Sequence, residues 1–242
     1  MSAQLPLRLR SPWWYRMRGM VFGVVYIVGF LGGAGLSRLA GHMYEPSFAV
    51  IGSRLGTNGP KVMLGIAAVF MIACWGLRAW GSAYLNADVV WNPDALTDAL
   101  IVEGPFRYTR SPLYLGNMCM AIGIGALATP AGLAIIVLGS LAFVLVLVQY
   151  ETRELLSRHG ALIKRYVARV PPLLPRLRPL RMMGSSPAAP SLAQGLRSEI
   201  FTAALGAGMI LLFIFGLGAL RECTVLWIAA WVAQQAATWP RE

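Results

Sequence analysis

Residues 104–148 read GPFRYTRSPLYLGNMCMAIGIGALATPAGLAIIVLGSLAFVLVLV, and the expected fold class follows from this stretch. A short polar segment that carries Arg107 and Arg110 precedes two apolar runs, which Pro130 separates. Each run lacks charged residues and approaches the length that crosses a bilayer, and the proline turn pairs the two as a hairpin. The sequence therefore predicts a transmembrane hairpin with charged residues at its open end.

The composition of the whole chain agrees with a membrane location. The 242 residues are 57% hydrophobic and 13% charged, with a mean hydropathy of +0.61, whereas about a quarter of a soluble domain is charged. We predict an all-α, polytopic integral membrane protein with about six transmembrane helices, and we expect Arg78 to snorkel from the end of the second span. The six apolar runs are residues 19–36, 62–77, 113–129, 131–148, 200–220 and 223–239.

The distribution of positive charge predicts the orientation. The formal net charge is +11, and with the N-terminus in the cytoplasm 17 of the 21 Lys and Arg residues fall in cytoplasmic segments. This asymmetry predicts that both termini are cytoplasmic, and we expect the bacterial inner membrane rather than the endoplasmic reticulum. Basic residues beside membrane spans indicate membrane lipids as partners and no nucleic acid.

The chain divides into three expected regions. Residues 1–178 form a membrane domain, residues 179–198 a linker within an irregular stretch from 171, and residues 199–242 a C-terminal transmembrane hairpin. Residues 151–166 are predicted to continue the fourth span as a basic amphipathic helix at the interface. Gly29 and Gly33 have the GxxxG spacing that permits close helix packing. The three cysteines lie in different spans, so we expect neither a metal site nor a disulfide.

Two sequence segments resemble a known family. Residues 100–116, LIVEGPFRYTRSPLYLG, resemble the L-V-x-x-G-x-Y-x-x-x-R-H-P-x-Y-x-G signature of the isoprenylcysteine carboxyl methyltransferase and phospholipid methyltransferase families. After the hairpin, seven residues resemble the closing segment of that family: Glu151, Leu155, Gly160, Tyr166, Val170, Pro171 and Pro175. The similar region runs from about residue 62 to 178.

The resemblance implies an integral-membrane methyltransferase that uses S-adenosyl-L-methionine as cofactor. It implies a cytoplasmic-side cofactor site next to a tunnel that faces the lipid, and a lipophilic substrate. Carried over position by position, the implied catalytic residues are Arg110 and Glu151. The implied cofactor-binding residues are Leu100, Ile101, Phe106, Ser111, Pro112, Leu113, Tyr114 and Glu151.

The residue types suit these roles. A carboxylate such as Glu151 can bind the ammonium group or the ribose hydroxyls of the cofactor, and Phe106 and Tyr114 can stack on adenine or border the sulfonium. The start of the third span can bind the methionine carboxylate through its N–H groups, and Arg110 can bind that carboxylate or an anionic headgroup. Because the chain has only two histidines, it favours an acceptor that needs no strong base: a carboxylate, a thiolate or a neutral amine of an isoprenoid or phospholipid.

The chain departs from the family's pattern at several positions, among them Phe106 for Tyr, Thr152 for the second Glu and His159 for Phe, and two further departures leave other functions open. Ser111 stands where the signature has His, and Leu147 stands where the prenylcysteine enzymes have an Arg that grips the substrate carboxylate. Membrane-bound sterol and steroid reductases, which bind NADPH, are similar in this region and provide one alternative. A non-catalytic membrane protein of the same fold is the other. The sequence leaves the acceptor, the oligomeric state and the role of the C-terminal hairpin open.

Overall fold

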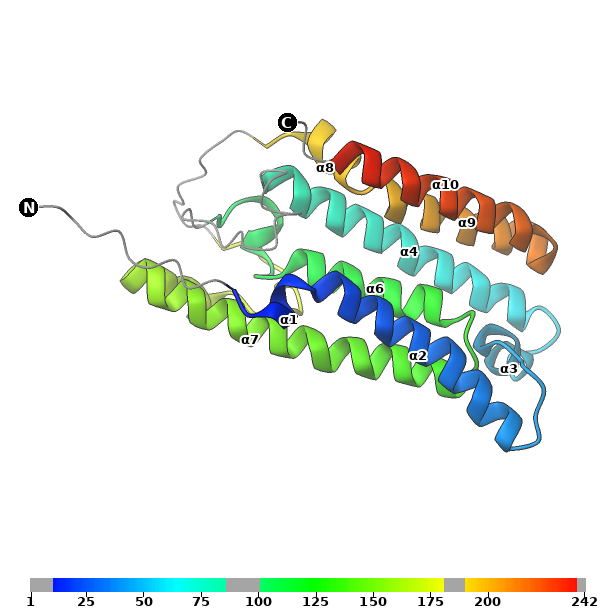
Figure 1. The fold of residues 1–242 in the computed structure, drawn as a ribbon. Helices are drawn as coiled ribbons and strands as arrows, with labels where there is room; N and C mark the ends of the chain where they lie inside the picture. Colours follow the sequence, from blue (N-terminus) through cyan, green and yellow to red (C-terminus); the bar gives the residue numbers. More distant parts are fainter. Residues whose placement is uncertain (1–10, 86–100, 181–189, 239–242) are drawn as a thin grey trace, which may run out of the picture.

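The computed structural model describes residues 11–85, 101–180 and 190–238, and within these ranges the regular structure is entirely helical. The helices form an elongated bundle (Figure 1). The longer helices are α2 (Arg18–Leu39), α4 (Gly59–Tyr84), α6 (Pro112–Gly125), α7 (Pro130–Arg169), α9 (Ile200–Phe215) and α10 (Leu220–Thr238). The shorter ones are α1 (Trp13–Arg16), α3 (Ser47–Ser53), η1 (Gly104–Arg107), α8 (Leu192–Ser198) and η2 (Gly216–Ala219).

Within the described residues, four helical stretches are long and apolar enough to cross a membrane: Arg18–Leu39, Gly59–Tyr84, Pro130–Ser157 and Ile200–Ala236. This confirms the all-helical class, with fewer such stretches than the six expected spans. The difference has two sources. The apolar helix α6 has 14 residues, or about 21 Å at 1.5 Å per residue, which is short of a hydrocarbon core of about 30 Å. The last stretch joins α9 and α10 through η2.

Gly216 divides this last stretch into two antiparallel helices. Its φ of 69° lies in the left-handed region, which favours glycine, and it ends α9. Beyond it α10 packs back along α9, and the side chains of Cys223 and Trp227 donate hydrogen bonds to the carbonyls of Gly208 and Ala204. The C-terminal segment is therefore folded as a hairpin of helices.

Helix α4 is the central helix of the bundle (Figure 1). Helix α4 lies between α6 and α9, helix α7 contacts α2 and α6, and α10 covers α9. The largest buried cluster joins α4, α9 and α10 through residues such as Met71, Met209 and Leu212. Large apolar side chains also cover the outside, including Leu31, Val69 and Leu138 at 64–70% exposure, an exterior that suits hydrocarbon better than water.

The predicted close packing at Gly29 and Gly33 is confirmed. A Cβ atom on Gly29 would lie 2.2 Å from Ile136 Cγ1, and one on Gly33 would lie 2.6 Å from the Cα of Gly132. Gly132 in turn contacts the carbonyl oxygen of Gly29, where its own Cβ would lie at 2.5 Å. Three glycines therefore bring α2 and α7 into backbone contact.

Residues 190–198 are more ordered than the sequence predicts, while residues 181–189 lie outside the described part of the chain. Residues 191–198 form α8 and its cap, where the side chain of Ser191 accepts a hydrogen bond from Gln194 N. The segment is fixed to the end of α4, because Ser191 N donates to Ala83 O and Gln194 Nε2 donates to Leu85 O. The expectation of an irregular stretch is wrong for α8, whose residues Gly195 and Ser198 are buried.

The close approach of α2 and α7 can be tested with a pair of glycine substitutions. Gly33→Ala should destabilise the protein by about 1–3 kcal/mol, because the new methyl group overlaps the backbone of α7. Gly35→Ala is the matched control, since nothing lies within 4 Å of its Cβ position and alanine is the better helix former. The measurement is thermal unfolding in detergent with a thiol-reactive dye, which reports exposure of the buried Cys74 and Cys223. Equal unfolding temperatures for the two variants would contradict this packing.

Candidate functional site

The two segments that resemble the methyltransferase family lie side by side at one end of the bundle. Arg110 N donates to Pro171 O at 3.0 Å, Arg176 N donates to Tyr108 O at 2.9 Å, and Leu180 N donates to Arg107 O at 3.0 Å. The Thr109 hydroxyl, which is buried, lies 3.1 Å and 3.0 Å from the carbonyl oxygens of Pro172 and Leu173. Residues 107–110 and 171–180 therefore form one folded unit across the open end of the α6–α7 hairpin, as the sequence predicts.

The conformation of Gly104 explains its place in the motif. Its φ is 55°, and a Cβ atom would lie 2.5 Å from the ring of Tyr84, so another residue would be strained and overlapped there. The turn that follows, η1, buries Phe106, whose carbonyl accepts a 2.8 Å hydrogen bond from the Tyr166 hydroxyl. Burial raises the pKa of Tyr166, so the phenol stays protonated and donates.

The predicted amphipathic helix is the continuation of α7, and three apolar residues near its end are buried. Ile163, Tyr166 and Val170 form a cluster with Val102, next to the buried Ile101. The last turns of α7 therefore pack on the motif segment. This contact holds the motif segment against the end of α7.

Helix α6 begins in the middle of the motif. Pro112 occupies its first turn, where the missing N–H costs nothing, and Ser111 precedes it as a buried cap residue. Leu113 fills the space above Gly81 of α4, where a Cβ atom would lie 2.5 Å from Leu113 Cδ1. The start of α6 is thus fixed against α4.

Glu151 connects the motif with α7. Its Oε1 accepts a hydrogen bond of 2.5 Å from the Tyr114 hydroxyl and one of 2.9 Å from the Tyr15 hydroxyl. Within the described chain its hydrogen-bond partners are these two phenols, and both donate to the same oxygen. Its surroundings therefore comprise two phenols on Oε1 and the nearby charge of Arg18, while Oε2 accepts no hydrogen bond from the described residues.

Tyr15 is the residue of this site that the sequence reasoning missed. It lies in α1, outside the region of resemblance, and it is buried against Phe22, Val144 and Leu147. Its ring packs on Tyr150 at 4.9 Å between centroids, and burial together with the Glu151 carboxylate raises the pKa of its phenol. No sequence motif marks this contact, which spans 136 residues of the chain.

The arginines at this end have unused hydrogen-bond donors. Arg110 Nη1 donates to the Thr152 hydroxyl at 2.9 Å, while Arg110 Nε, Arg107 Nε and Arg176 Nη1 are buried and have no partner in the described chain. Burial lowers the pKa of Arg110, although its ordinary value is so high that the group stays charged. Buried donors without partners are uncommon, and here they belong to three positively charged side chains at one end of the bundle.

Leu147 is fully buried in the cluster of Tyr15, Phe22 and Val144. The position where the prenylcysteine enzymes would have a substrate-gripping Arg is therefore part of the apolar core here. The site can bind an anionic group only through residues elsewhere.

Among the predicted site residues, the structure brings Tyr114 and Glu151 into direct contact. Arg110 lies close to them, because it donates a hydrogen bond to Thr152, the residue that follows Glu151 in α7. Ser111, Pro112 and Leu113 adjoin them at the start of α6, while Ile101 and Phe106 pack at the other side of the motif. Leu100 lies outside the described residues.

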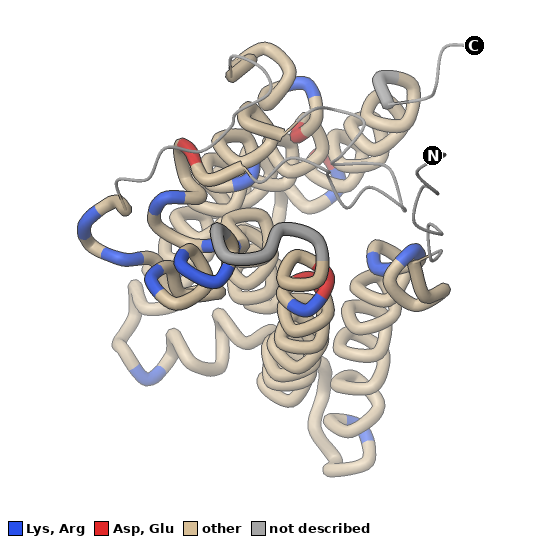
Figure 2. Tube along the Cα trace, turned by 90° about the vertical axis from the view of Figure 1, so that its left-hand side faces the viewer, with Lys and Arg blue, Asp and Glu red and all other residues tan. Residues whose placement is uncertain are grey.

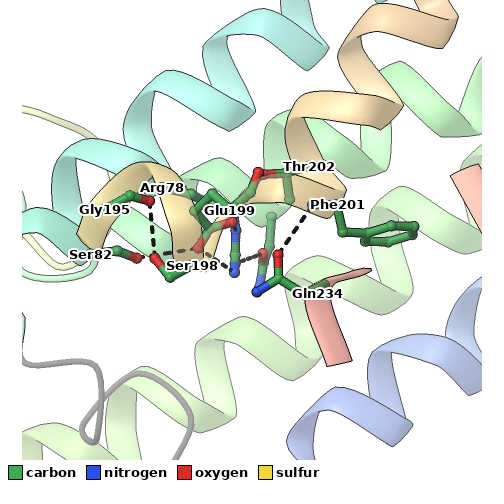
Figure 3. A network of polar contacts seen from close by, with 9 residues as sticks. Arg78, Ser82, Gly195, Ser198, Glu199, Phe201, Thr202 and Gln234 are labelled. Atoms are coloured by element: carbon green, nitrogen blue, oxygen red, sulfur yellow. Dashed lines mark hydrogen bonds and ion pairs between the residues drawn. The ribbon is translucent and has the colours of Figure 1, made fainter. Parts of the chain in front are cut away.

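A second polar network lies beside the site, and it corrects the expectation for Arg78. Instead of snorkelling to the interface, Arg78 forms an ion pair with Glu199 at 2.7 Å, and the carboxylate is 1% exposed (Figure 3). The hydroxyls of Ser82 and Thr202 donate to the same carboxylate, and Arg78 Nη1 donates to Asn117 Oδ1 at 2.6 Å. The network joins α4, α6 and α9.

Searches against protein-family models, curated proteins and solved structures find no match to this chain. The fold itself defines the class: an all-helical protein with four helical stretches that are long and apolar enough to span a membrane.

The contact between residues 107–110 and 171–180 can be tested at Thr109. Thr109→Val keeps the shape but removes the hydroxyl that contacts two buried carbonyl groups, so we expect a loss of about 1–3 kcal/mol in stability. Thr224→Val is the control, because that hydroxyl bonds the carbonyl four residues earlier on an exposed helix face. The unfolding temperatures of both variants are measured with the thiol-reactive dye, as for the Gly33 variant. A Thr109 variant as stable as the control would show that the contact contributes nothing.

Proposed function

We propose that this protein transfers a methyl group from S-adenosyl-L-methionine to a lipophilic or membrane-embedded acceptor. The observation that carries the proposal is the arrangement of Glu151. Within the described residues this partly buried carboxylate accepts hydrogen bonds from two phenols, and Arg18 is the cation whose charge acts on it from nearby, so a cationic ligand can add the direct contact that the carboxylate lacks. The cofactor is such a ligand, since it bears a sulfonium and an ammonium group.

The positively charged side chains of Arg107, Arg110 and Arg176 support the same ligand class, because they complement its negatively charged group. A zwitterionic cofactor needs an acceptor for its ammonium group and donors for its carboxylate, and the two kinds of residue lie on neighbouring elements here. An acceptor with an anionic headgroup can use the same arginines, because a guanidinium binds carboxylate and phosphate alike. The residues therefore fit the cofactor that the resemblance implies.

When bound, the cofactor would supply an electrophilic methyl group, which passes to the acceptor's nucleophile as the carbon–sulfur bond breaks and leaves S-adenosylhomocysteine. The chain's own residues need only to bind, align and exclude water. Tyr15 and Tyr114 hold Glu151 in place through their hydroxyls, and the apolar cluster around Leu147 keeps water from the inner side of the carboxylate. The phosphate or carboxylate of an acceptor would lie at the arginines, at the membrane interface.

The proposed topology has six spans, with both termini and the site on the cytoplasmic side. In this arrangement α6, α9 and α10 are short spans, and the turns at 126–129 and 216–219 face outward. Figure 2 supports it, since most Lys and Arg residues lie towards the end of the bundle that carries the motif. That asymmetry is the pattern of a cytoplasmic face, and we propose the bacterial inner membrane as its location.

Two single cysteines test the topology. Leu217, in η2, is 52% exposed, and Leu177, between α7 and α8, is 100% exposed. In intact cells a membrane-impermeant maleimide should label Leu217→Cys from outside, whereas Leu177→Cys should react only after the membrane is permeabilised. The unsubstituted chain gives the background of the three native thiols. Labelling of Leu177→Cys in intact cells would reverse the proposed orientation, and a protected Leu217→Cys would rule out an outward turn there.

Cofactor binding is the direct test of function. S-adenosylhomocysteine, titrated by calorimetry into the purified protein, should bind with micromolar affinity. Glu151→Gln should weaken binding by about 10- to 150-fold, the equivalent of the about 1.5–3 kcal/mol of a hydrogen bond to a charged group.

Glu222→Gln is the matched control, because Glu222 is an exposed carboxylate on α10. This variant should bind S-adenosylhomocysteine with the same affinity as the unsubstituted protein. A parallel titration with NADPH separates the reductase alternative. Binding of NADPH without S-adenosylhomocysteine would replace the proposal by that alternative, and binding of neither by folded protein would favour a non-catalytic role.

A further inference from the structure

We infer that the Arg78–Glu199 pair is a positioning device that ties the C-terminal hairpin to the first turns of α6. The hairpin is then part of the site rather than an accessory anchor. The functional half of this inference rests on the proposed cofactor site, whereas the mechanical half can be measured without any ligand.

Arg78 is the central residue because one side chain contacts two helices. Its Nε and Nη2 bind the two carboxylate oxygens of Glu199 at 2.7 Å and 3.0 Å, while Nη1 reaches Asn117 of α6. The rigid planar guanidinium fixes the angle between these contacts, which a lysine cannot do. Arg78 therefore links α6 and the start of α9 through a single group.

Gly116, the last glycine of the motif, leaves room for the side chain of Arg78 beside α6. A Cβ atom on Gly116 would lie 2.6 Å from Arg78 Cγ and 3.2 Å from the carbonyl oxygen of Cys74. Together with the contact of Leu113 on Gly81, this interlocks α4 with the first turns of α6. The motif glycine is thus explained by the passage of Arg78 towards Glu199.

On the hairpin side the carboxylate is fully engaged. Ser82 donates to Glu199 Oε1 at 3.2 Å and Thr202 donates to Oε2 at 3.0 Å, in addition to the two bonds from Arg78 (Figure 3). Helix α10 joins through Gln234, whose Oε1 accepts from Phe201 N, and Gly195 of α8 contacts the carbonyl of Ala79 directly. A buried carboxylate whose two oxygens both have donors is held rigidly in an apolar environment, so the Arg78–Glu199 pair transmits position rather than binding a ligand.

The path from this network to the site is short. Asn117 follows Tyr114 by three residues, about one helical turn, on the same face of α6. Tyr114 donates to Glu151, so a shift of the first turns of α6 changes the geometry around that carboxylate. The hairpin, α4 and α6 thereby set the separation between the motif and α7.

A double substitution separates positioning from simple stabilisation. Removing one partner leaves a buried charge unpaired, which unfolds many proteins, whereas replacing both by apolar residues of similar volume is often neutral for stability. We therefore choose R78M/E199M. The matched control is R221M/E222M, which removes an arginine and a glutamate from exposed positions of α10.

The first readout is hydrogen exchange of peptides within residues 104–118, with thermal unfolding as the test of folding. In R78M/E199M we expect exchange of these amides to rise at least tenfold, while the unfolding temperature stays within a few degrees of the unsubstituted protein. The second readout is S-adenosylhomocysteine affinity, which should fall at least tenfold. The control should match the unsubstituted protein in all three measurements. If the double variant does not fold, Glu199→Asp replaces it, since the shorter carboxylate keeps the charge but draws the contacts apart.

Unchanged exchange in a folded variant overturns the positioning role, whatever the ligand result. Raised exchange with unchanged affinity overturns the claim that the hairpin belongs to the cofactor site. Failure of the unsubstituted protein to bind S-adenosylhomocysteine counts against the proposed function, and in that case the exchange result still decides whether the pair positions α6.

Discussion

Polar groups inside an apolar helical bundle must find their partners within the protein, and the architecture here depends on that constraint. The ion pair between Arg78 and Glu199 meets it completely, with four hydrogen bonds to the carboxylate. Glu151 meets it only in part, through two phenols on one oxygen. The contrast separates two roles for buried charge: a satisfied pair fixes helices, while an incompletely satisfied carboxylate has the capacity to bind.

The same constraint explains why the end of the bundle is ordered without regular structure. Residues 171–180 have no helix, and their backbone groups pair with residues 107–110 instead. Proline at 171, 172, 175 and 179 prevents a helix, and each removes a donor that would otherwise need a partner. Thr109 supplies a side-chain donor where the backbone of 172–173 presents carbonyl groups. Irregular backbone is stable here because it is held against the motif.

The sequence predicts features whose cause is local or lies in a repeated spacing. The α6–α7 hairpin, the GxxxG contact at Gly29 and Gly33, and the meeting of the two arginine-rich segments all follow from apolar length, small-residue spacing and a proline turn. The contacts that it misses join residues far apart: Tyr15 with Glu151 over 136 positions, and Arg78 with Glu199 over 121. From the sequence, Arg78 is expected to snorkel because it lies near a helix end. Its partner Glu199 could not be foreseen, because the sequence does not show where residue 199 lies relative to α4. Helix α8 was missed for a similar reason, because prolines and serines on its N-terminal side mask a short helix that α4 stabilises.

Leu147 bears on where an acceptor can be held. Full burial beside Phe22 and Val144 leaves no room there for a charged head, so this protein cannot grip an anion from the middle of α7 as the prenylcysteine enzymes are expected to do. Instead, Arg107, Arg110 and Arg176 each have a buried guanidinium nitrogen without a partner among the described residues, and they lie on the motif and the segment paired with it. Beside them, Leu174 and Leu177 are 75% and 100% exposed, which suits contact with acyl chains. An anchor for charge next to exposed leucines matches the chemistry of a membrane interface, where a lipid presents its headgroup and its chain together. Leucine at position 147 therefore agrees with the proposed function if the anionic group of the methyl acceptor stays at the interface.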